Sequence, residues 1–143
     1  MSQADLTRLE SDRVQELTKT AEWVRAELSR SVGYDVEFDA TGVQLLDEWI
    51  ENVLKRSPVP ERRLKLLWTV FLGEVFRRRH EGVWAIQKGE KDDLVVLFPT
   101  SSGGGYVVEV AEQVRRRIAQ GFAASLALYY TEQGFSIVAS KAG

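Results

Sequence analysis

One carboxylate, that of Glu74, lies within a mostly apolar segment of the chain, residues 64–76. On a helical wheel it falls beside Val70 and Phe71, on a face that should pack against the protein interior. A carboxylate in such a place is either paired with a cation or located at a cleft. Glu74 is therefore expected either to form a structural ion pair or to contact a ligand or partner from a pocket.

Three arginines are candidate partners for Glu74. Arg78 follows it by one helical turn, the spacing at which opposite charges on a helix meet. Arg115 and Arg117 border the apolar face of a later predicted helix, so their stems could cover apolar surface while a guanidinium reaches Glu74. If these residues surround a cleft, Trp84 would complete the site of a small ligand-binding protein or enzyme.

The remaining chemistry-bearing residues are too few for a metal centre. The sequence has no cysteine and one histidine, which excludes thiolate sites and sites built from several histidines. His80 and Glu81 are adjacent, and adjacent residues on a helix point about 100° apart, so they do not form an acid–base pair. His80 is expected to cap its helix instead. We therefore expect no catalytic residue, no metal and no cofactor.

The glycine-rich segment of the chain is Ser101–Gly105. A phosphate-binding loop lies between a strand and a helix, where helix amides meet the anion, but a predicted strand follows this segment. The segment therefore predicts a flexible connection between two strands, with a mobile flap over a pocket as the functional alternative.

Two runs of three arginines, Arg77–Arg79 and Arg115–Arg117, are the basic clusters of the chain. Three consecutive residues of a helix spread over about 200° of its circumference, so neither run forms a flat basic patch. Local ion pairs and solvated faces are expected, with an anion site for phosphate or nucleic acid as the alternative. A formal net charge of −2 argues against a protein that reads nucleic acid.

Apolar spacing predicts four helices that would position these residues. The first spans residues 3–31, and its stripe should either pack on the same domain or pair with a second copy or another protein partner. The stripe consists of Val14, Leu17, Ala21, Val24 and Leu28. The other helices run from Asp39 or Thr41 to Arg56, from Pro60 to His80 and from Ala111 to Gln133.

After Gly82 the apolar residues alternate with polar ones, which predicts strands. Three segments show this pattern: Val83–Lys88, Leu94–Phe98 and Tyr106–Val110. Tyr34–Phe38 and Phe135–Ala139 are weaker strand candidates. The expected fold class is α+β, in one domain over residues 1–143. It comprises a long N-terminal helix, two further helices, a three-stranded antiparallel meander and a C-terminal helix packed on the sheet.

The composition is typical of a globular domain. The 143 residues are 44% hydrophobic and 28% charged, and no apolar run approaches the roughly 18 residues of a membrane span. The N-terminal segment has neither the basic region nor the apolar region of an export signal. A cytoplasmic location without membrane contact is therefore expected.

A loose pattern runs through the centre of the chain, roughly residues 67–130. It consists of Leu72-Gly73-Glu74-Val75, a glycine before Trp84, Phe98-Pro99 and Arg116-Arg117-Ile118. This order resembles bacterial families of domains of unknown function. The resemblance implies a bacterial, cytoplasmic α+β domain and supplies no catalytic residue.

These observations favour a binding or interaction module without chemistry of its own, such as an accessory, regulatory or immunity-type protein. The alternative is a small ligand-binding protein or enzyme with a cleft around Glu74, between the central helix and the sheet. An unpaired Glu74 in a cleft would favour the second hypothesis, and a closed core would favour the first.

We predict no sequence-specific binding to nucleic acid. The negative net charge leaves only weak, salt-sensitive contacts through the arginines. In fluorescence anisotropy, any affinity should fall steeply between about 50 and 200 mM salt and should not distinguish one DNA or RNA sequence from another. A sub-micromolar complex with one defined sequence at physiological salt would contradict the prediction.

Overall fold

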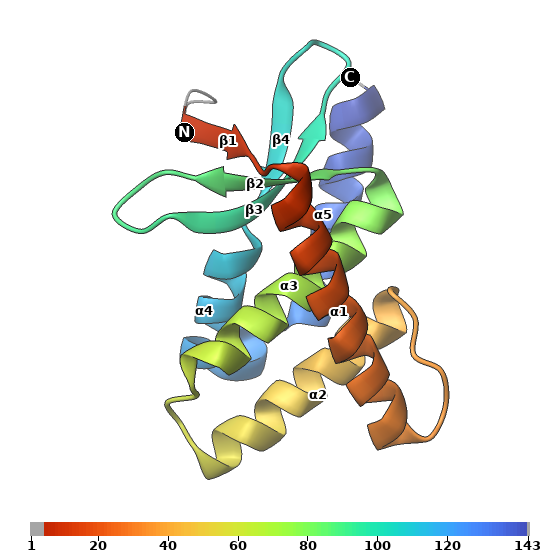
Figure 1. Ribbon diagram of the computed structural model, residues 1–143, viewed down its shortest axis with the longest axis vertical. Helices are drawn as coiled ribbons and strands as arrows, with labels where there is room; N and C mark the ends of the chain where they lie inside the picture. Colours follow the sequence, from red (N-terminus) through yellow and green to blue (C-terminus); the bar gives the residue numbers. More distant parts are fainter. Residues whose placement is uncertain (1–4, 143) are drawn as a thin grey trace.

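The chain folds into an antiparallel sheet with helices packed on one of its faces, which confirms the α+β class (Figure 1). The structure is a computed structural model and describes residues 5–142. In that range the elements are β1 (Leu6–Arg8), α1 (Ser11–Val32), α2 (Ala40–Arg56), α3 (Arg62–His80), β2 (Val83–Gln87), β3 (Asp93–Pro99), β4 (Gly105–Val108), α4 (Val110–Gln120), the 3₁₀ turn η2 (Gly121–Ala124) and α5 (Leu126–Ala142).

The sheet has four strands among the described residues, in the order β1-β2-β3-β4, all antiparallel. The predicted three-stranded meander is therefore incomplete. Strand β1 forms from a segment that the sequence pattern assigned to the first helix, because its residues pair with the edge of β2. The Leu9 amide extends this pairing by donating to the Trp84 carbonyl. Residues 3 and 4 of the predicted helix lie outside the described part.

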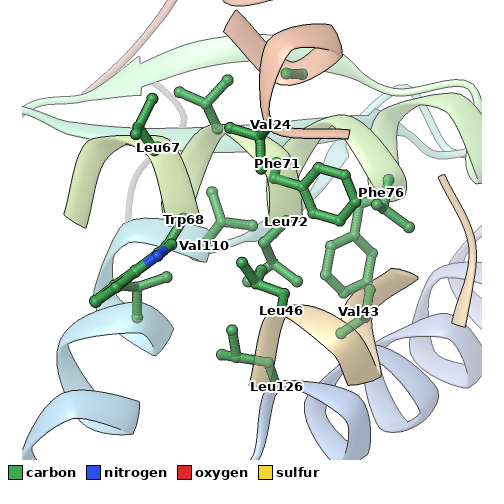
Figure 2. Close-up of a cluster of buried hydrophobic side chains, with 14 of the residues drawn as sticks. Val24, Val43, Leu46, Leu67, Trp68, Phe71, Leu72, Phe76, Val110 and Leu126 are labelled. Carbon is green, nitrogen blue, oxygen red and sulfur yellow. The ribbon is translucent and has the colours of Figure 1, made fainter. Parts of the chain in front are cut away.

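Helix α3 lies at the centre of the structure. The ten residues Leu67–Phe76 are all buried, because α1, α4, α5 and the sheet pack around them. Figure 2 shows Trp68 and Phe71 extending from α3 into the core that it shares with α2 and α4. The helix begins two residues later than Pro60, after Glu61 in extended backbone.

Helix α1 packs against α3 through its predicted stripe, so this apolar face is used within the chain. Val14 is partly buried, and the buried members of the stripe are Leu17, Ala21, Val24 and Leu28. Burial of apolar side chains at this spacing is what stabilises an amphipathic helix of moderate length.

The linker after α1 is held by side chains of α1 and does not form the strand predicted over Tyr34–Phe38. Nη1 of Arg25 donates to the Val36 carbonyl at 2.9 Å, and the Val36 amide donates to the Ser29 hydroxyl at 2.9 Å. These bonds satisfy backbone groups that a neighbouring strand would otherwise pair with. Asp39, one of the two predicted caps, then caps α2 by accepting from the Gly42 amide.

The single helix predicted over residues 111–133 is broken into α4 and α5. Gly121 follows α4 with φ of 67° and ψ of −146°, a conformation that favours glycine. Helix α5 continues through Gly134, so the strand predicted over Phe135–Ala139 is wrong. Helix α4 packs on β3, whereas α5 packs mainly against α2 and α3 and only marginally against the sheet.

Gly73 allows the sheet to approach α3 closely. A Cβ atom at this position would lie 2.0 Å from Cη2 of Trp84, far inside van der Waals contact. The indole is buried and hydrogen-bonded, so it has little room to move aside. The close contact of α3 with β2 therefore depends on a residue without a side chain.

We predict that Gly73→Ala lowers the free energy of unfolding by about 1–3 kcal/mol or more, because the added methyl group collides with a buried indole. The matched control is Gly134→Ala in α5, where a new Cβ would meet nothing closer than 3.6 Å. The control should gain up to about 1 kcal/mol from helix propensity. Urea denaturation followed by circular dichroism measures both variants, and equal stabilities would contradict the prediction.

Candidate functional site

The Glu74 carboxylate is fully enclosed. Its side chain is 0% exposed, and each oxygen accepts two hydrogen bonds. Oε1 accepts from Arg77 Nε at 2.6 Å and from Trp84 Nε1 at 3.1 Å. Oε2 accepts from Arg77 Nη2 at 2.6 Å and from Arg78 Nε at 2.7 Å. The structure thus brings Glu74, Arg78 and Trp84 together, as the sequence suggested, and adds Arg77.

These hydrogen bonds keep Glu74 ionised despite its burial. Burial alone raises the pKa of the carboxyl, but the hydrogen bonds from Arg77, Arg78 and Trp84 together outweigh it and hold the pKa below its ordinary value. A carboxyl whose pKa is lowered on folding stabilises the fold above its unfolded pKa and loses that contribution as the pH falls through the folded value. Ionised Glu74 therefore stabilises the protein at neutral pH.

Within the described residues, no cleft reaches the Glu74 carboxylate. Trp84 is itself buried, and the Arg78 guanidinium lies 4.0 Å from the centre of the Phe38 ring. This stacking links the cluster to the segment that leads into α2. The arrangement joins α3 to β2 and leaves no oxygen of Glu74 available to a ligand.

A second buried cluster surrounds Arg117, which does not contact Glu74. The Arg117 side chain is 0% exposed and points to α2, where Nε donates to Asp47 Oδ1 at 2.9 Å and Nη2 donates to Glu51 Oε1 at 3.0 Å. The guanidinium also lies 4.3 Å from the centre of the Phe122 ring. The expected approach of Arg117 to Glu74 is therefore wrong, because α4 directs this side chain toward α2.

Asp47 also caps α5 from another helix. Its Oδ1 accepts from the Leu126 amide at 3.0 Å, and its Oδ2 accepts from the Ala127 amide at 2.8 Å and the Ser125 hydroxyl at 3.0 Å. Amides of the first helical turn have no partner within their own helix, so Asp47 supplies the missing acceptors. Asp47 is not among the residues singled out from the sequence, although it lies one helical turn from Val43 and Ile50 on an apolar helix face, which is the same signal that singled out Glu74.

Ion pairs account for five of the six arginines in the two basic clusters, within residues 5–142. Arg115 pairs with Asp93 and Glu112, each at 2.6 Å, rather than with Glu74, because it faces the β2–β3 connection. Arg79 is the exception, since no carboxylate of the described residues lies within 4.0 Å of its guanidinium. The local ion pairs expected from the sequence are therefore present everywhere except at Arg79.

Arg79 lines a pocket of about 510 Å³ between the start of α2, the end of α3 and one side of α5. We call it the α5 pocket. Its apolar walls come from Phe38, Tyr130, Phe135 and Val138. Its charged groups are Arg79 and Asp39. A volume of this size falls in the range of small-molecule sites, which are mostly apolar with a few polar groups that orient the ligand.

The His80 imidazole borders the α5 pocket. Burial lowers its pKa below the ordinary value, and the charges of Arg79 and Lys141 lower it further, so the ring is largely neutral at pH 7. The ring packs edge-on against Phe98, with centroids 6.1 Å apart. It has no hydrogen-bond partner among the residues that the structure describes, so no acid–base pair is assembled around it.

The segment Ser101–Gly105 connects β3 to β4, as predicted from its position between two strands. The Thr100 amide donates to the Gly104 carbonyl at 3.0 Å, and Gly103 adopts a φ of 87°. These features describe a tight turn with bonds of its own, and a role as a flap stays a prediction.

Residues 5–142 contain no group of three His, Asp or Glu side chains that could hold a metal ion. Across the same range, each helix is too short or too polar to cross a membrane.

Comparison of the chain with protein-family models, with curated proteins and with solved structures finds no match. The resemblance to bacterial domains of unknown function therefore stays a prediction. The function has to be inferred from the geometry of the described residues.

We predict that Glu74→Ala lowers the free energy of unfolding by about 2–4 kcal/mol, because a buried indole N–H and two guanidinium groups lose their acceptor. Glu74→Gln should recover only part of the lost free energy of unfolding, since its amide nitrogen would face two hydrogen-bond donors. Glu132→Ala, an exposed acid on α5, is the control and should change stability by less than about 0.5 kcal/mol. Thermal and urea denaturation measure the stability of each variant. A Glu74→Ala protein as stable as the control would refute the structural role of Glu74.

Proposed function

We propose that this protein is a binding or interaction module without chemistry of its own, acting in the bacterial cytoplasm as an accessory, regulatory or immunity-type protein. The closed Glu74 cluster carries the proposal. The carboxylate best placed for chemistry is enclosed, and both of its oxygens are occupied by hydrogen bonds. The bacterial and cytoplasmic setting comes from the sequence pattern.

The outer side of α5 is the surface that best fits this role. Leu128, Phe135 and Val138 are 56%, 75% and 57% exposed. Their spacing of three and seven residues places them on one side of the helix; we call them the α5 face. Neighbouring exposed apolar side chains of this size are typical of interaction surfaces.

The alternative is a small ligand-binding protein or enzyme with a cleft around Glu74, and the geometry gives it less support. A ligand could reach the carboxylate only if Trp84 or an arginine gave up its hydrogen bond, which would leave a buried donor unsatisfied. Arg115 and Arg117, which would complete such a site, are paired with other carboxylates.

Contact through the helix of residues 1–31, with a second copy or another protein, also stays a prediction. The apolar stripe of α1 is buried against α3, so a partner would have to use the opposite side of the helix. Trp23 lies outside the stripe and is 48% exposed. The α5 face offers more apolar side chains in one place and is therefore the preferred surface.

We predict that Phe135→Asp removes partner binding without changing the fold, because an aspartate cannot be buried in an apolar interface without a cation. The matched control is Val59→Asp, which places the same charge at a residue 80% exposed between α2 and α3. The measurement is affinity purification of each tagged full-length protein from its own cells, followed by quantitative mass spectrometry. Circular dichroism and melting temperature confirm that both variants fold.

A protein retained by the wild type and by Val59→Asp, and reduced at least about tenfold by Phe135→Asp, would support this function. Equal recovery by all three proteins, or no specifically retained protein, would contradict it.

A further inference from the structure

The α5 pocket opens beside the α5 face, and the two share Phe135 and Val138. In Figure 1, α5 runs alongside the end of α3. Asp39 and Ala40, at the start of α2, also line the pocket. A partner that covers the α5 face would therefore also cover the mouth of the pocket. Phe38, in the segment before α2, and Tyr130 on α5 add partly buried aromatic walls. The apolar lining suits an apolar side chain inserted from the partner.

The charges around the α5 pocket favour an anion. Arg79 is exposed and has no carboxylate within 4.0 Å among the described residues, unlike the other arginines of its cluster. The Lys141 amino group lies outside the pocket lining and donates to the His80 carbonyl, so Arg79 is the cation that faces the pocket. Asp39 is the one acid lining the pocket, and its Oδ1 is occupied by the Gly42 amide at the start of α2. The positive end of that helix further offsets its charge.

We propose that the α5 pocket receives the C-terminal residue of a partner protein, with an apolar side chain between the aromatic walls and the terminal carboxylate on Arg79. This inference rests on the proposed function and names the chemistry that the same surface recognises. A chain terminus is the place in a polypeptide where one residue carries both an apolar side chain and a carboxylate. Capture of that carboxylate is an established mode of peptide recognition.

Other anions fit the pocket less well. A phosphate group prefers several converging donors, such as an arginine cluster or a run of backbone amides. Here a single guanidinium faces apolar walls, and Asp39 would repel a dianion more strongly than a monoanion. One guanidinium matches one carboxylate, since its planar fork can donate two parallel hydrogen bonds to it.

The test is a titration of the full-length protein with N-acetyl-L-phenylalanine, followed by ¹H–¹⁵N NMR. This compound reproduces an apolar C-terminal residue with its amide and carboxylate. Saturable shifts should appear at the backbone amides of Thr131 and Gly134, which line the pocket. N-acetyl-L-phenylalaninamide lacks only the charge and should bind at least about tenfold more weakly.

Arg79→Gln should weaken binding of N-acetyl-L-phenylalanine to the level of the uncharged amide. Arg63→Gln is the matched control, because it removes the same charge from an exposed residue of the same helix that lies outside the α5 pocket. Binding by Arg63→Gln should equal that of the wild type. Equal affinity for acid and amide, equal binding by Arg79→Gln, or shifts confined to another region would overturn the inference.

Two further outcomes separate the possible sources of the carboxylate. 3-Phenylpropanoate keeps the ring and the acid but lacks the peptide amide; if it binds as tightly as N-acetyl-L-phenylalanine, the pocket recognises free small acids and the C-terminal assignment is wrong. Suppose that Phe135→Asp removes a partner from the affinity purification while neither acid binds. The proposed interaction function is then supported, and the recognition of a C-terminal carboxylate is contradicted. If the acids bind but no partner depends on Phe135, the proposed function is contradicted together with the assignment to a partner's C-terminus, and the pocket remains only a site for carboxylates.

Discussion

The rest of the structure depends on the carboxylate of Glu74, which holds a strand and a helix to one another in the centre of the protein. Its oxygens join Arg77 and Arg78 on α3 to the indole of Trp84 on β2. Burial of a charge is unfavourable unless every lone pair finds a donor, and here the donors are present. Gly73 contributes to the same contact, because the absence of a side chain leaves the space in which the Trp84 indole reaches the Glu74 carboxylate.

A second carboxylate, that of Asp47, joins helices to one another, as Glu74 joins α3 to β2. It binds Arg117 of α4 and the first amides of α5 while belonging to α2, so three helices meet at one side chain. Both clusters lie in the interior, where hydrogen bonds to ions are strong and an unpaired ion is costly. Glu74 and Asp47 are both hydrogen-bonded within the chain. The surface proposed for recognition therefore uses exposed groups around Arg79 and α5.

Features set by local spacing could be predicted from the sequence. The ion pair of Glu74 with Arg78 follows from a separation of four residues, and the burial of α1 follows from its apolar stripe. Features set by contacts between residues far apart in the sequence could not be predicted. Strand β1 forms because its residues pair with the edge of β2. The break before α5 is stabilised by Asp47, which lies about eighty residues earlier in the chain. The partners of Arg117 and the isolation of Arg79 likewise depend on which elements pack together, which no local pattern specifies.

The capping of α5 by Asp47 has a consequence for how the chain acquires its fold. During synthesis α2 leaves the ribosome well before α5, so the acceptor for the first turn of α5 is in place before that turn exists. Most of the stability of a helix in a protein comes from the packing of its apolar face, and α5 obtains that packing by docking on α2 and α3. The surface proposed for recognition is thus assembled after α2 and α3, and a chain in which α5 has not docked does not display it.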